Sequence, residues 1–194
     1  MAPLSPNTST KHLGQDVAVD RSVRDEVADL VLDAPRAPEQ SFPGGATELE
    51  IEDLQGRLGF PLPPALVDWL RVCKGEAIGP GGVLGARPDR PSLDIATTMD
   101  EFVAWRLNRW IPIAGDGCGD HYVLIDDGKL AKCVGYVDQE NFDVIRYVVA
   151  SDLWLFLRFL LRSDAGDRSW PFDRNEVLSA DPGMGAVPSE LLPW

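Results

Sequence analysis

The sequence predicts an α+β protein with an antiparallel sheet of about four to six strands and helices packed mainly on one face. Two observations lead to this fold class. Segments with helical periodicity come first, and a run of apolar strands with short turns follows them between residues 110 and 149. One more helical segment ends the pattern near residue 162. Helices and strands are therefore segregated along the chain, as is typical of α+β proteins.

Residues 1–46 are expected to be an N-terminal extension with one short helix. Mixed polar composition predicts little order in residues 1–19. Ser22 can cap the helix, with Asp25 three residues on, and prolines and glycines in residues 34–45 are typical of a linker. The apolar residues of this helix share one face: Val23, Val27, Leu30 and Val31.

Residues 47–162 are expected to form the main domain. Its first helix begins at a capping box formed by Thr47 and Glu50, and the helix ends at Gly59. Pro63-Pro64 begins the second helix, because the first turn does not use the N–H that proline lacks, and Gly75 is expected to cap its end. The apolar faces are Ile51, Leu54 and Leu58 in the first helix, and Leu66, Trp69, Leu70 and Cys73 in the second.

The centre of this domain is predicted to be the sheet. A helix capped by Thr98 that runs to Trp105 or Arg106 comes before it, and a helix capped by Ser151 or Asp152 follows it as far as Arg162. Asp127-Gly128 is a favourable pair for a hairpin turn. Apolar and β-branched residues between turn signals predict four strands, at residues 110–114, 121–126, 131–137 and 142–149.

Residues 163–194 are expected to be a C-terminal tail, rich in proline, glycine and aspartate. Its tryptophans, Trp170 and Trp194, either pack back on the domain or dock a partner, and packing back is favoured. Within the domain, Trp69 and Leu157 are expected to be buried where the helices meet the sheet.

The acidic composition restricts the class of partner. The 194 residues carry a formal net charge of −13, with a pI near 4.5. A nucleic-acid partner is excluded because the chain has no basic cluster to displace counterions from phosphates, and an anionic membrane is disfavoured for the same reason. A basic protein partner is favoured by long-range attraction. The alternative interpretation is that the acidic composition only keeps the protein soluble.

No export signal or membrane span is recognised in the sequence, so a cytoplasmic location is expected. The three cysteines, Cys73, Cys118 and Cys133, lack the close spacing of a zinc site. Without an export signal they are interpreted as free thiols.

Asp116, Asp120, His121 and Asp126 are the residues that a metal site or a hydrolase would use. The calcium-loop pattern is absent, however. Neighbouring residues of a strand point to opposite faces, so Asp120 and His121 do not converge. A turn stabilised by aspartate hydrogen bonds to the backbone is favoured, and a metal-dependent hydrolase stays open as the less favoured alternative.

Three segments carry a family resemblance. Residues 58–70 hold the proline-rich start of a helix that closes at Lys74-Gly75. Residues 110–126 hold a Trp-Ile-Pro-Ile strand, a glycine-aspartate turn and a second apolar strand, and residues 148–157 hold the start of the last helix. In this order the segments resemble the SUKH superfamily, which contains the Smi/Knr-like cell-wall regulators of fungi and many bacterial toxin-immunity proteins.

The resemblance implies an α+β domain that binds another protein and is neither an enzyme nor dependent on a cofactor. A bacterial immunity protein that occludes a cognate polymorphic toxin is the leading expectation, and a regulatory scaffold is the alternative. Such toxins are often basic nucleases, which an acidic inhibitor would complement. The residues expected to face the partner are acidic: Asp116, Asp120, Asp126, Asp127, Asp138, Glu140 and Asp143.

Overall fold

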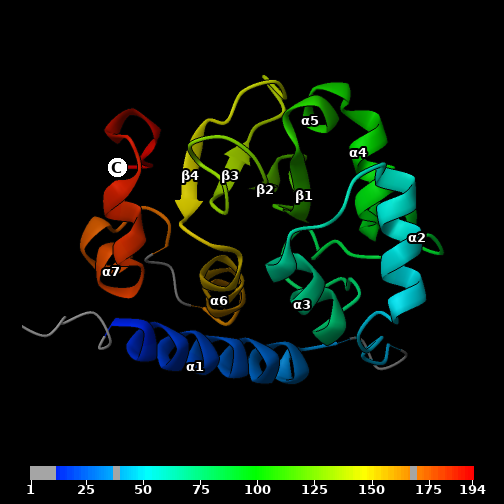
Figure 1. The fold of residues 1–194 in the computed structure, drawn as a ribbon, viewed down its shortest axis with the longest axis horizontal. Coiled ribbons are helices and arrows are strands. Elements are labelled where there is room, and N and C mark those ends of the chain that lie inside the picture. The colour runs from blue at the N-terminus through cyan, green and yellow to red at the C-terminus, as the bar shows by residue number, and fades with distance from the viewer. Residues whose placement is uncertain (1–11, 37–39, 167–169) are drawn as a thin grey trace, which may run out of the picture.

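A four-stranded antiparallel sheet in the order β1-β2-β3-β4 lies at the centre of the protein (Figure 1). The computed structural model describes residues 12–36, 40–166 and 170–194, and only the backbone of residues 12–22. Seven α-helices in this part of the chain accompany the sheet. The predicted α+β class with one antiparallel sheet is confirmed. The strands are β1 (Trp110–Gly115), β2 (His121–Ile125), β3 (Val134–Val137) and β4 (Tyr147–Ala150).

Two strands begin later than the sequence pattern predicts. β3 starts at Val134 because residues 126–133 form a wide turn, in which the N–H of Lys132 donates to the carbonyl of Ile125 at 2.8 Å. β4 starts at Tyr147, not at residue 142. Its expected first residues lie in a loop, where the side-chain and backbone oxygens of Asn141 accept from the N–H groups of Asp143 and Val144 and so compete with strand pairing.

The first two domain helices follow the sequence closely. α2 (Glu48–Leu58) begins at the predicted capping box, and Gly59 ends it in the left-handed conformation at φ 83°. α3 (Pro64–Val72) begins at the proline pair, as predicted. It ends at Cys73 instead of Gly75, because Cys73 already takes an extended conformation.

The helix expected from Thr98 is two short helices, α4 (Ile95–Glu101) and α5 (Val103–Asn108). Asp94, not Thr98, caps α4 by accepting from the Thr97 N–H at 2.9 Å. After the sheet, α6 (Leu153–Asp164) begins at the predicted Asp152 cap, whose carboxylate accepts from the Leu155 N–H at 3.0 Å.

The flanking segments contribute side chains to the same hydrophobic core as the domain. α1 (His12–Asp33) begins well before Ser22 and runs beneath α6 and α3 in Figure 1. Among the side chains of α1 that the structure describes, Val23, Val27 and Val31 are buried. In the tail, α7 (Arg174–Ala180) follows Trp170, whose indole N–H donates to the Val149 carbonyl at 2.9 Å. Trp170 thus packs back, as predicted. Three short 3₁₀ segments complete the described secondary structure: Pro91–Leu93, Pro182–Ala186 and Ser189–Leu191.

Neighbouring residues of β2 contact different helices. The ring of His121 lies 5.3 Å from that of Trp105 in α5, whereas the ring of Tyr122 lies 5.0 Å from that of Phe156 in α6. Trp69 and Leu157 are fully buried, as predicted. None of the helices within the described residues combines the length and the apolar character that a membrane crossing needs.

Candidate protein-interaction surface

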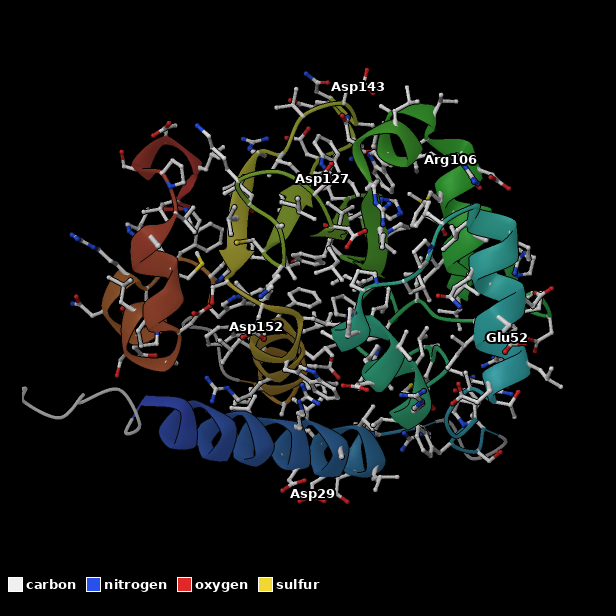
Figure 2. The ribbon with its side chains drawn as sticks, in the orientation of Figure 1. Asp29, Glu52, Arg106, Asp127, Asp143 and Asp152 are labelled. Carbon is white, nitrogen blue, oxygen red and sulfur yellow. The ribbon has the colours of Figure 1, made fainter. Side chains whose placement is uncertain are left out.

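The seven carboxylates expected to face a partner lie at two ends of the sheet. Val137 pairs with His121, so the turn at 116–120 and the loop at 138–143 share one end. Asp126 and Asp127 follow the other end of β2. One residue of each group, Asp143 and Asp127, is labelled in Figure 2. The fold therefore brings five of the residues to one end of the sheet: Asp116, Asp120, Asp138, Glu140 and Asp143. The other two, Asp126 and Asp127, lie at the opposite end.

Asp116 and Asp120 stabilise their own turn. The Asp116 carboxylate accepts from the N–H groups of Cys118 and Asp120 at 2.7 and 3.0 Å. Asp120 accepts from the Gln139 N–H at 2.8 Å and from the Tyr136 hydroxyl. Burial, and then the hydrogen bond to Asp120, raise the pKa of Tyr136. Asp116 therefore closes the turn, and Asp120 joins it to the 138–143 loop.

Two more of the carboxylates are engaged by arginines. Asp126 accepts from Arg109, whose Nε lies 2.8 Å away, and Asp138 pairs with Arg146. The guanidinium of Arg146 lowers the pKa of the Asp138 carboxyl. Asp127, Glu140 and Asp143 remain exposed, and none of these three forms an ion pair within the described residues.

A shallow hollow of about 690 Å³ lies between α5 and the loop that carries Glu140 and Asp143. We call it the α5–loop surface and define it by the residues that line it: Glu101, Phe102, Val103, Ala104, Leu107, Glu140, Asn141, Phe142 and Asp143. Val103 and Leu107 are 72% and 80% exposed. This surface therefore combines exposed apolar side chains with exposed carboxylates.

Sequence reasoning did not single out Val103 and Leu107, although a signal was present. They are four residues apart and so share one face of a helix, while Trp105 between them points elsewhere. Trp105 is fully buried. Because Trp105 occupies the side of the helix that faces the core, the positions of Val103 and Leu107 could have identified an apolar face turned away from the core.

His121 lies under this surface. Its ring is within 6.5 Å of the rings of Phe102, Trp105 and Phe142, and burial lowers the pKa of its imidazole. An aromatic environment of this kind favours the neutral ring. The side chain therefore packs against the aromatic rings at the base of the surface.

A second hollow, of about 540 Å³, lies between α1, α3, the turn after β2 and the start of α6. Arg24 crosses it, pairing with Asp68 at 2.9 Å and lying 5.0 Å from the Trp154 ring. Asp126, also on its wall, is paired with Arg109. Arg24, Asp68 and Asp126 are thus paired within the chain, and the exposed Lys132 on the same wall would repel a basic protein. The α5–loop surface is therefore the better candidate for binding a basic partner.

No group of three or more histidine, cysteine, aspartate or glutamate side chains within the described ranges could hold a metal ion. Cys73, Cys118 and Cys133 are free thiols, and burial raises the pKa of Cys73 to about 11. A thiol with so high a pKa is a poor nucleophile.

Calcium, magnesium or zinc should leave the melting temperature of the protein unchanged. The Asp116 and Asp120 carboxylates already accept hydrogen bonds from the chain, and a metal would have to replace them. A ligand present at a hundred times its dissociation constant would add about 2.7 kcal/mol to stability. A thermal melt with and without each metal makes the comparison, and a clear rise would support the hydrolase alternative.

The chain matches the SMI1 / KNR4 family (SUKH-1) over residues 45–158. The match covers α2 to the middle of α6, the whole sheet and the α5–loop surface, and it leaves α1 and α7 outside. No protein with a curated description matches the chain.

Proposed function

Because the chain belongs to the SMI1 / KNR4 family (SUKH-1), we propose that it is a non-catalytic bacterial immunity protein that binds and occludes a cognate polymorphic toxin. In this proposal residues 47–162 form the binding domain, flanked by an extension at 1–46 and a tail at 163–194. The protein acts in the cytoplasm, where such a toxin would otherwise reach its substrate.

One observation carries the proposal beyond the family. The chain has a net charge of −13, and Glu101, Glu140 and Asp143 are exposed on the α5–loop surface. Like the two loop residues, Glu101 forms no ion pair within the part of the chain that the structure describes. Unpaired surface carboxylates attract a basic partner over a distance and speed its association.

A regulatory scaffold of the Smi/Knr type is the alternative, and it would use the same surface for a different protein. Co-expression with a toxin encoded in a neighbouring reading frame separates the two. An immunity protein restores growth and forms a stable complex with the toxin, whereas a scaffold does neither. Growth arrest that the protein does not relieve would contradict the immunity proposal.

Neutralising the three carboxylates should slow association with the toxin. We expect Glu101→Gln, Glu140→Gln and Asp143→Asn together to reduce the association rate by about tenfold at low salt, with little change in dissociation. Stopped-flow binding at two salt concentrations measures this, and salt should narrow the difference because the Debye length falls from about 10 Å at 0.1 M to about 3 Å at 1 M.

Asp127→Asn provides the matched control, because Asp127 is an exposed carboxylate at the other end of β2. It should leave the association rate nearly unchanged. If Asp127→Asn slows association by about twofold, which is the share of one charge in a tenfold effect of three, then the net charge of the protein matters and the position of the carboxylates does not.

A further inference from the structure

We infer that the exposed apolar face of α5 is the centre of the contact with the partner. The partner then presents a large apolar side chain ringed by lysine or arginine. This inference rests on the proposed function only in requiring that a protein partner exists. It adds the surface and the chemistry of the group that the surface binds.

The apolar face of α5 is exposed. Val103 and Leu107 lie on one side of α5, and Trp105 on the other side is buried in a stack with Phe102 at 4.1 Å between ring centroids. Single exposed apolar residues are common on protein surfaces. Two such residues one helical turn apart, beside a hollow of about 690 Å³, instead resemble the apolar patches that mark interaction sites.

The α5–loop surface is held in place before any partner binds. The indole N–H of Trp105 donates to the Phe142 carbonyl at 2.7 Å, and the rings of Phe102 and Phe142 lie 4.4 Å apart. Arg106 donates to the Leu58 carbonyl at the end of α2. These contacts fix α5 against the loop and against α2, so binding requires little additional ordering of the chain.

Negative charge surrounds the exposed apolar residues. Glu101, Glu140 and Asp143 line the same hollow, and no lysine or arginine does. Arg106, the nearest arginine on α5, pairs with Asp100. An apolar centre inside a charged rim is the usual arrangement of a protein interface. The acidic rim selects a basic partner and opposes a second copy of this chain, whose α5–loop surface carries the same charges.

The test uses a phage-displayed library of random peptides, selected on the immobilised full chain. Selected peptides are synthesised, and their affinities for the parent and its variants are measured by fluorescence polarisation. We expect peptides in which lysine or arginine flanks a large apolar residue. Leu107→Asp and Val103→Asp should each weaken their binding by about tenfold or more, as the loss of a central anchor does.

The matched control is Leu49→Asp, which changes a residue of α2 that is 76% exposed and should leave affinity within about twofold. Equal binding to Leu107→Asp, peptides without basic residues, or no selected peptides would each overturn the inference. Sedimentation showing a dimer that Leu107→Asp dissociates would also overturn it, in favour of self-association. Peptide binding that depends on Leu107, together with no protection from a toxin, would retain this inference and reject the immunity proposal.

Discussion

Trp69→Ala should lower the free energy of unfolding by about 3–5 kcal/mol. Trp69 is fully buried in α3, and its ring meets that of Trp154 in α6 edge to face, with centroids 6.0 Å apart. Its indole N–H has no hydrogen-bond partner within the described residues. The loss is therefore one of packing and of buried apolar surface, with no hydrogen bond removed. Urea denaturation at neutral pH measures the effect.

Leu49→Ala is the control for this measurement, since Leu49 is apolar but exposed. It should change the free energy of unfolding by no more than about 0.5 kcal/mol. Equal stabilities of Trp69→Ala and the parent would show that the contact between α3 and α6 does not contribute to the core.

Asp94→Ala is expected to have the second large effect, a loss of about 3 kcal/mol. The Asp94 carboxylate is fully buried and accepts from Arg57 of α2, from the Arg87 N–H at 3.0 Å and from the Thr97 N–H at 2.9 Å. Its removal takes away the cap of α4 and the link to α2, and it leaves a buried N–H without a partner. Asp53→Ala is the matched control, because Asp53 is mostly exposed and lies 3.9 Å from the same Arg57. An ion pair at the surface contributes little to stability.

The same substitution should alter the pH dependence of stability. Burial by itself would raise the pKa of Asp94, but the hydrogen bonds from Arg57 and Thr97 outweigh it and lower the pKa. A carboxyl whose pKa is lower in the folded state stabilises the protein above its unfolded pKa of about 3.9, and this contribution is lost as the pH falls through the folded value. The parent should therefore lose more stability than Asp94→Ala between about pH 5 and pH 2. Parallel losses in urea denaturation across this range would contradict the role of Asp94.

The candidate site shows where sequence reasoning reached its limit. The carboxylates were all identifiable from the chain, but their partners were not. Asp126 and Asp138 pair with Arg109 and Arg146. The separation of Asp127 from Glu140 depends on strand pairing, since β3 lies between them along the chain. Which charges stay free for a partner is a property of the folded chain.

The helices and strands that could be predicted from the sequence alone are those fixed by interactions between residues close together in the chain. The capping box at Thr47, the proline pair at the start of α3 and the Asp152 cap of α6 each act within a few residues. Strand residues such as those of β1 and β2 have strong β preferences and short turns. For these elements the local pattern and the fold agree, and the prediction is confirmed.

Only the tertiary structure decided the features that depend on distant residues. Asp94 caps α4 where Thr98 was expected, because its carboxylate also meets Arg57 and Arg87. Val103 and Leu107 are exposed because Trp105 is the side chain of α5 that the sheet and the loop bury. In each case long-range packing or a long-range charge outweighs a local preference, and neither is visible in a short window of sequence.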